Sequence, residues 1–280
     1  MTERYVIVTG AAQGIGRATT LHLAAQGFHL FAGVRKLADG DTLVAAGGTA
    51  VMPILLDVTD PAQIVAAADQ VRTVVGAAGL AGLINNAGVA IAGPLEFMPL
   101  DALRNQLEVN VVGQIAVTQA FLPLIRQGNG RIINISSMAG RVAGPGTGPY
   151  HASKFALEAL TDTLRQELAP WAIDVVSIQP GVINTPIWEK SLARARQMVA
   201  ALPDAAHRLY GPQMVQQLAR SEQQRDRGIP AERVAAIVSN ALTATRPRTR
   251  YQVGFDALIA VNLVARLPDR WRDWLLARRG

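Results

Sequence analysis

The sequence predicts an α/β fold, and three observations support this prediction. Short runs rich in β-branched residues alternate with longer segments whose apolar residues recur at helical spacing. The chain has 280 residues, 50% of them hydrophobic, which suits one large α/β domain or two small ones. No Pro- or Ser-rich linker and no break in composition divides it. We therefore expect a single domain over residues 1–280.

The first predicted strand, Tyr5–Thr9, leads through a glycine-rich turn into a helical pattern. The turn reads Gly10-Ala-Ala-Gln13-Gly14-Ile15-Gly16. A helix that begins here offers free N–H groups and the positive end of its dipole, which favour a phosphate. The three glycines remove side chains where a pyrophosphate would approach. The turn could instead serve tight packing alone, but the order strand, turn, helix favours binding.

The second and third predicted strands, residues 28–34 and 51–56, both end in charged residues. Arg35 and Lys36 follow the second strand, and Asp57 follows the third. Ligands of open parallel sheets bind at the carboxyl ends of strands, so these residues are binding candidates. The alternative is that they are solvated loop or turn residues.

The next helix begins at Asp60-Pro61, with Asp60 as the N-cap and Pro61 at the first helical position. The fourth strand, residues 80–84, runs into Asn85-Asn86-Ala87-Gly88, and a long helix is predicted over residues 100–126. Asn110 lies in the middle of that helix among valines, where a buried amide is costly unless it is hydrogen-bonded.

The fifth strand, residues 131–136, delivers Ser137 to its carboxyl end, and a loop rich in Gly and Pro then leads into a helix that carries Tyr150 and Lys154. A phenol has a pKa of about 10, so it exchanges protons poorly at neutral pH. A lysine one turn away stabilises the phenolate and would lower that pKa, and the Ser137 hydroxyl could bond the same oxygen. Such a set could polarise a carbonyl. Alone, Tyr150 and Lys154 could equally form a surface pair.

The rest of the chain contains a sixth strand, residues 174–179, and a loop over residues 180–186. An amphipathic insertion, residues 187–228, follows and should cover a substrate, although the same pattern also suits plain packing. Residues 250–255 are predicted to form an edge strand. Residues 256–280 are expected to form a C-terminal helical extension that ends in an amphipathic helix.

Three of these motifs together resemble the short-chain dehydrogenase/reductase family, nearest its steroid and retinol dehydrogenase branch. They are the glycine turn from Thr9 to Gly16, the run Asn85-Asn86-Ala87-Gly88, and Ser137 thirteen residues before Tyr150 with Lys154 after it. The resemblance covers residues 5–181 in the family's order. It implies one doubly wound (Rossmann) parallel sheet with helices on both faces, a helical substrate lid and a nicotinamide dinucleotide.

The resemblance also implies the roles of individual residues. Ser137 would hold the substrate oxygen, Tyr150 would exchange its proton, and Lys154 would lower the pKa of that tyrosine and bind the nicotinamide ribose. Asn110 would hold a water that connects Lys154 to solvent. A plain buried hydrogen bond is the alternative for Asn110.

By the same resemblance, the cofactor site should use the strand ends, the glycine turn and the loop after the sixth strand. NAD-selective relatives carry an acidic residue where this chain has Arg35-Lys36, and a guanidinium suits a 2′-phosphate, so we expect NADP(H) in preference to NAD(H). The expected cofactor-binding residues are Gly10, Gln13, Gly14, Ile15, Gly16, Arg35, Lys36, Asp57, Val58, Asn86, Ala87, Gly88, Tyr150, Lys154, Pro180, Gly181, Val182 and Thr185.

The amino-acid composition excludes several classes of functional site. The chain has no cysteine, which excludes disulfides, thiolate metal sites and a cysteine nucleophile, and we expect no metal. We expect no signal peptide, no transmembrane segment and no nucleic-acid partner, and a cytoplasmic location. The net charge is +6, with arginines gathered late in the chain. These could contact an anionic lipid or partner surface, although a solvated helix face is the favoured interpretation.

The sequence thus predicts an NADP(H)-dependent oxidoreductase that interconverts a secondary alcohol and a ketone by hydride transfer. The apolar insertion favours a bulky hydrophobic substrate, similar to a steroid or a retinoid. A 3-oxoacyl thioester reductase is the alternative within the same class. A binding protein that senses NADP(H) without significant turnover is the alternative from another class. The resemblance further implies a homodimer or homotetramer.

Overall fold

The computed structural model describes residues 3–279, apart from the side chains of residues 188, 190, 224, 226 and 277–279. Residues 1, 2 and 280 of the expected domain lie outside the described part. Seven strands form one parallel sheet in the order β3-β2-β1-β4-β5-β6-β9. They are β1 (Tyr5–Thr9), β2 (His29–Val34), β3 (Val51–Leu55), β4 (Gly82–Asn85), β5 (Arg131–Ile135), β6 (Val175–Pro180) and β9 (Arg250–Val253). The expected strand limits are confirmed to within two residues.

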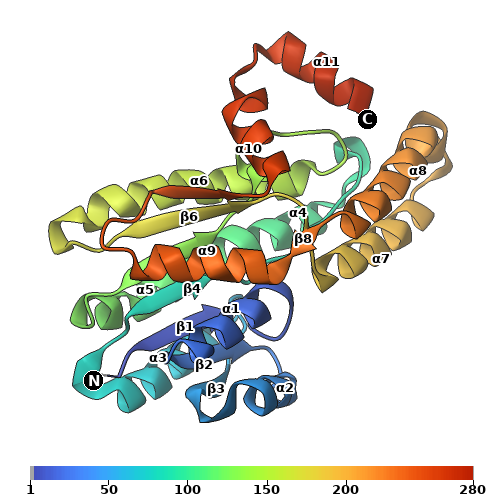
Figure 1. Ribbon diagram of the computed structural model, residues 1–280. Coiled ribbons are helices and arrows are strands. Elements are labelled where there is room, and N and C mark those ends of the chain that lie inside the picture. The colour runs from blue at the N-terminus through green and yellow to red at the C-terminus, as the bar shows by residue number, and fades with distance from the viewer. Residues whose placement is uncertain (1–2, 280) are drawn as a thin grey trace.

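Helices cover both faces of the sheet (Figure 1). One face carries α1 (Gly14–Ala25), α2 (Ala38–Gly47) and α9 (Ala231–Thr243). The other carries α3 (Pro61–Val75), α5 (Gly113–Gln127) and α6 (Gly148–Leu168). The doubly wound fold is therefore confirmed, and the strand order reverses between β1 and β4, where open sheets of this kind bind ligands.

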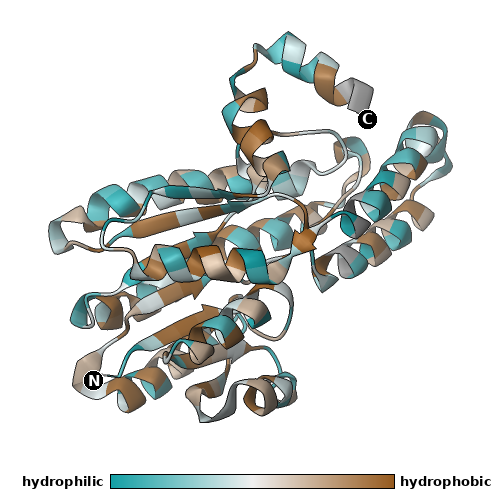
Figure 2. Cartoon of the chain, in the orientation of Figure 1, coloured by the Kyte–Doolittle hydropathy of each residue, from teal (hydrophilic) through white to brown (hydrophobic). Residues whose placement is uncertain are grey.

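Each face of the sheet has its own apolar core, and strand β1 shows why. Side chains alternate between the two faces of a strand. Tyr5 and Ile7 pack into the core under α3 and α5, while Val6 and Val8 pack into the core under α1 and α9. All four are buried. The central strands are accordingly mostly hydrophobic, whereas the covering helices mix hydrophobic and hydrophilic residues (Figure 2).

The single long helix expected over residues 100–126 is interrupted. Helix α4 (Leu100–Leu107) passes through a π-helical turn, Glu108–Val112, into α5. The whole stretch Leu100–Gln127 is long and apolar enough to span a membrane by length and composition. A core helix meets the same criterion, and here Val117, Phe121 and Ile125 are fully buried in the protein. The stretch is therefore weak evidence for a membrane span.

Two helices of the insertion, α7 (Pro186–Ala200) and α8 (Asp204–Asp226), extend away from the carboxyl ends of the strands, and we call them the lid (Figure 1). An ion pair between Arg196 and Glu222 joins them. Two short strands, β7 (Ile183–Asn184) and β8 (Ile229–Pro230), pair where the lid leaves and rejoins the body.

The C-terminal extension consists of two helices joined by a short turn. Helix α10 (Phe255–Asn262) follows β9 directly, and a short turn leads to α11 (Asp269–Arg279). Helix α2 was not expected from the sequence. Brief 3₁₀ turns occur at Gly48–Ala50, Gly76–Ala78, Leu95–Phe97, Met138–Gly140, Ala169–Trp171 and Val264–Arg266.

Candidate active site

The glycine turn lies between β1 and α1. Gly10 has a φ of +63°, a left-handed conformation that favours glycine. A Cβ atom on Gly16 would lie 2.3 Å from the Gly10 carbonyl oxygen, so the first turn of α1 packs directly on the loop. The N-cap residue Gln13 makes no side-chain hydrogen bond to the N–H groups of the first turn, which contains no acidic residue. This helix end therefore suits a phosphate.

The loop after β4 is fastened to that turn. The Oγ1 of Thr9 accepts hydrogen bonds from the backbone N–H groups of Asn86 and Ala87, both at 2.9 Å. The Asn86 side-chain amide donates in return to the carbonyls of Thr9 and Gly10, at 2.8 and 3.2 Å. The motif that runs into Gly88 thus holds the ends of β1 and β4 together at the point where the strand order reverses.

The charged residues after β2 and β3 lie at the carboxyl edge of the same sheet. Arg35 and Lys36 are exposed. Asp57 is fixed by its neighbour, because its Oδ1 accepts from the backbone N–H and the hydroxyl of Thr59 at 2.9 and 2.8 Å. Val58 is buried beside it. Asp60 caps α3 as expected, accepting from the N–H groups of the first turn.

Ser137 lies in the turn after β5 and is only 8% exposed. Its Oγ accepts from the Ala139 N–H at 3.1 Å and donates to the Pro180 carbonyl at 3.4 Å. The Tyr150 hydroxyl forms a hydrogen bond with it as well. Ser137 therefore links the ends of β5 and β6 to the first turn of α6.

Lys154 lies one turn after Tyr150 and is 5% exposed. Its ammonium donates to the Ile135 carbonyl at 2.8 Å and lies 5.9 Å from the centre of the Tyr150 ring. Burial lowers the pKa of Lys154 to about 8, and Glu158 opposes this shift. Burial also raises the pKa of Tyr150, and the Ser137 hydrogen bond lowers it in part.

The net pKa shift of Tyr150 in this structure is therefore upward, opposite to the lowering that we expected for this phenol. Loss of hydration outweighs the favourable contacts of the phenol, so its pKa rises. The lysine ammonium bonds the Ile135 carbonyl instead of the phenol oxygen. Tyr150 is consequently protonated at neutral pH and suits the role of a proton donor.

Asn110 is fully buried in the π-helical turn. Its amide nitrogen donates to the Val89 carbonyl at 2.9 Å and to the Ser153 hydroxyl at 3.1 Å, and its oxygen accepts from the Val89 N–H at 2.9 Å. The Ser153 hydroxyl donates to the Tyr150 carbonyl at 2.7 Å. The side chain thus makes structural hydrogen bonds, and the water relay stays a prediction. These bonds connect the loop after β4 to the helix of Tyr150.

Two residues of the site were missed by sequence reasoning. Gln106 binds the same loop as Asn110, donating to the Val89 carbonyl at 2.7 Å and accepting from the Ile91 N–H at 2.8 Å. A second amide one helical turn before Asn110 was the available signal. Asp256 accepts from the Val182 N–H at 2.7 Å, and 74 residues separate this pair, so no local pattern indicates it.

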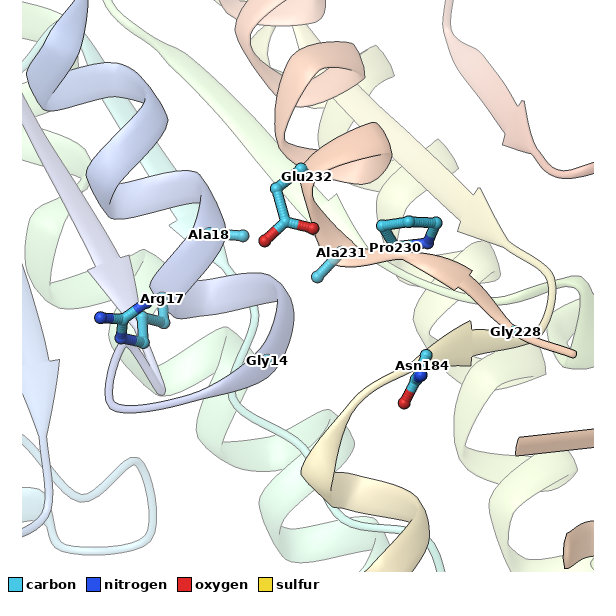
Figure 3. Close-up of a pocket in the computed structure, with 8 residues that line it drawn as sticks. All are labelled: Gly14, Arg17, Ala18, Asn184, Gly228, Pro230, Ala231 and Glu232. Atoms are coloured by element: carbon cyan, nitrogen blue, oxygen red, sulfur yellow. The ribbon is translucent and has the colours of Figure 1, made fainter. Parts of the chain in front are cut away.

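The loop after β6 closes the site from the lid side. Thr185 is buried and its side chain lies against Gly14 of the glycine turn. A cavity of about 370 Å³ opens beside this contact, between the start of α1, Asn184 and the start of α9. Figure 3 shows Glu232 of α9 directed toward Ala18 of α1 across it. The expected loop residues Pro180, Gly181, Val182 and Thr185 therefore lie between the Ser137 turn and the glycine turn.

The lid contacts the loops on either side of Tyr150. Ser191 of α7 donates to the Ala90 carbonyl at 3.1 Å. Gln217 of α8 donates to the Pro145 carbonyl at 3.0 Å, in the loop that precedes α6. These two hydrogen bonds tie the insertion to the loop after β4 and to the loop before α6.

Comparison with known proteins agrees with this geometry. The family model described as short chain dehydrogenase matches residues 4–196. Retinol dehydrogenase 5 of Mus musculus is 38% identical, over 99% of this chain and 90% of that protein. An NADPH-dependent 3-dehydrocapnine reductase of Ornithobacterium rhinotracheale is 36% identical, over 96% of this chain and 95% of that protein.

A solved structure supports the same conclusion. The short chain dehydrogenase/reductase from Burkholderia phymatum in complex with NAD is 26% identical and has a TM-score of 0.79, covering 98% of this chain and 95% of that one. The family match extends over well more than half of the chain, and the relatives align over nearly all of it. This chain therefore belongs to the short-chain dehydrogenase/reductase family and is an NAD(P)-dependent oxidoreductase.

Proposed function

We propose that the protein uses NADP(H) to interconvert a secondary alcohol and a ketone, and that its substrate is bulky and hydrophobic. The observation that carries the proposal is the buried group of Ser137, Tyr150 and Lys154 at the carboxyl end of β5. This group lies at the same edge of the sheet as the glycine turn, and that turn suits a phosphate.

The residues present fit a dinucleotide. The start of α1 at the glycine turn and the close packing of Gly16 on Gly10 place backbone N–H groups where a pyrophosphate would bind. Asp57, fixed by Thr59, would bind the adenosine end, and Lys154 the nicotinamide ribose. NADP(H) supplies the hydride when it is bound.

The side chains of the site supply the proton chemistry. In ketone reduction, the Ser137 hydroxyl holds the carbonyl oxygen and Tyr150 donates its proton to that oxygen. The raised pKa of Tyr150 keeps this proton in place until the oxygen gains negative charge. The positive charge of Lys154 then stabilises the phenolate that remains.

The preference for NADP(H) rests on Arg35 and Lys36. Both are exposed directly after β2, where a 2′-phosphate on the adenosine ribose would meet a cation. The relatives alone do not establish which dinucleotide is preferred, because one is named as NADPH-dependent and the structure of another was solved in complex with NAD.

The preference for a bulky apolar substrate rests on the lid. Leu192, Ala195 and Met214 are buried between α7, α8 and the body. Met198 lies against Gly93 beside Met98, at the loop that follows β4. Methionines adapt to irregular apolar shapes. That one relative is named a retinol dehydrogenase supports the same substrate class.

The test measures reduction of steroid ketones, retinal-like carbonyls, 3-oxoacyl thioesters and small ketones, each with NADPH and with NADH. We expect turnover of the bulky apolar carbonyls with NADPH, and loss of that turnover in Tyr150→Phe while NADPH still binds. Equal efficiency with NADH would reject the cofactor preference, and turnover restricted to thioesters would reject the substrate class. Tight NADPH binding without turnover of any of these compounds would favour a sensor.

A further inference from the structure

Helix α6 carries titratable side chains at four successive turns on the face toward β5, β6 and β9. The first two belong to the site already described, and the last two do not. In order they are Tyr150, Lys154, Glu158 and Asp162. Side chains four residues apart on a helix lie next to each other.

Glu158 is a buried carboxylate, only 3% exposed. One oxygen accepts from the Ser177 hydroxyl of β6 at 2.5 Å, and the other pairs with Arg250 of β9 at 2.9 Å. Arg250 also reaches Asp162 at 2.6 Å. A buried carboxylate is costly unless it is paired and hydrogen-bonded, and both of its oxygens are engaged here. Glu158 is therefore held as an anion.

Lys154 is buried as well, but it lacks such a partner. Its ammonium donates to the neutral carbonyl of Ile135, and no carboxylate within the described residues lies in ion-pair contact with it. Burial favours the uncharged amine. Glu158, one turn along the helix, acts against this loss of charge.

Other groups around Lys154 do not supply a negative charge at neutral pH. Tyr150 is protonated, since burial raises its pKa, and burial lowers the pKa of His151, which bonds the Ala139 carbonyl. Ser177 from β6 and Asn110 from the π-helical turn are neutral, and Arg250 from β9 is a cation. Asp162 lies one turn farther away and shares Arg250.

We propose that Glu158, anchored by Arg250 and Ser177, is a positioning residue that keeps Lys154 in its charged form at neutral pH. This inference rests on the proposed function only for its effect on catalysis. The electrostatic pair itself can be measured without substrate or cofactor.

Nuclear magnetic resonance of the ligand-free protein tests the pair directly. The chain contains three lysines, Lys36, Lys154 and Lys190, so ¹³C labelling at lysine Cε yields few signals, and Lys154→Arg assigns one of them. We expect Glu158→Gln to lower the titration midpoint of Lys154 by about one pH unit, a tenfold change in its ionisation constant. Asp162→Asn is the matched control, since it also removes a carboxylate bound to Arg250, and it should leave the midpoint nearly unchanged.

A second variant, Arg250→Gln, tests the same electrostatic pair even if Glu158→Gln does not fold. In Arg250→Gln, the nearest strong cation to Glu158 becomes Lys154, so the midpoint should rise instead of fall. Folding of each variant is checked by circular dichroism. If folded Glu158→Gln and Arg250→Gln both titrate as the wild type does, the proposal is overturned.

The pH profile of ketone reduction tests the consequence for catalysis. The pH at which kcat/KM falls on the alkaline side should be lower by the same interval in Glu158→Gln. In Asp162→Asn that pH should be unchanged. An enzyme without ketone reductase activity would reject the proposed function, yet the lysine titration would still decide the role of Glu158. A shifted titration with an unchanged profile would overturn the claim that this charge serves catalysis.

Discussion

At the scale of single residues, the site depends on burying an ammonium and a phenol together. Lys154 is 5% exposed and its pKa falls to about 8, so the folded protein holds this proton less firmly than the unfolded chain does. Tyr150 shifts in the opposite sense and keeps its proton. Both shifts have the same physical cause, because burial disfavours the charged form of each group.

The lowered pKa of Lys154 makes stability depend on pH. The unfolded chain binds the proton up to about pH 10.5, while the folded protein loses it near pH 8, so stability should rise as pH increases between these values. We expect Lys154→Met to gain stability relative to the wild type at pH 7. The upper bound is about 3 kcal/mol, and the gain should shrink toward pH 10.

Urea unfolding of both proteins at pH 7 and pH 10 measures this difference. Comparing the two proteins at each pH cancels the contribution of every other titrating group. A stability difference that stays constant across this range would show that Lys154 titrates as an exposed lysine does.

At the scale of elements, the loop after β6 is held by segments distant in the sequence. The Val182 N–H donates to Asp256 of α10, and the Val182 carbonyl accepts from the Ile229 N–H of β8 at 3.0 Å. Both backbone groups of Val182 are therefore fixed from outside the loop. This loop is the one that we expect to lie over the nicotinamide.

Replacing Asp256 should loosen this loop. Asp256→Ala removes the acceptor of the Val182 N–H, and a hydrogen bond of this kind contributes about 1 kcal/mol, so NADPH should bind about fivefold more weakly. Asp256→Asn keeps an oxygen acceptor and should bind within about twofold of the wild type. Fluorescence titration with NADPH measures both affinities. Equal losses in the two variants would show that charge, and not the hydrogen bond, fixes the loop.

The elements show which parts of the fold were predictable. Runs of β-branched residues and glycine turns are local signals, so all seven strands of the sheet and the Asp60 cap were found. The π-helical turn was missed, because its single irregular turn hardly disturbs the apolar spacing around Asn110.

Contacts that join distant segments could not be predicted from local patterns. Glu158 and Arg250 are 92 residues apart, and their pairing depends on β9 lying beside β6. The sequence placed Tyr150 and Lys154 on one helix, but the sign of the tyrosine pKa shift depends on burial, which follows from the tertiary structure.

At the scale of the whole molecule, α10 and α11 extend beyond the sheet on the side of the lid (Figure 1). They expose Phe255, Leu263 and Trp271, at 78%, 61% and 70%. Arg266 and Arg270 lie close to them in the sequence, both exposed and neither paired with a carboxylate among the described side chains. We call these five residues the C-terminal surface. Exposed apolar side chains gathered with cations are typical of proteins that lie on a membrane surface.

The charge of this surface favours an anionic lipid layer over a second copy of the chain. Two copies docked through it would bring unpaired arginines of like sign together, whereas anionic headgroups would neutralise them. We therefore expect the protein to sediment with vesicles that contain phosphatidylglycerol and to remain in solution with phosphatidylcholine alone. Such binding would bring the lid face close to an apolar phase from which hydrophobic substrates could enter.

Substitutions separate the contribution of the apolar side chains to vesicle binding from non-specific adsorption. The double variant Phe255→Ser with Trp271→Ser should lose vesicle binding, while Val65→Ser, which changes an exposed apolar side chain on α3, should keep it. Arg266→Gln with Arg270→Gln should weaken binding by about 2 kcal/mol at low salt, since each cation near an anionic surface contributes about 1 kcal/mol. Equal sedimentation with both kinds of vesicle would contradict the role of charge. Loss of a dimer in the serine variant, with no change in lipid binding, would show instead that this surface joins two copies of the chain.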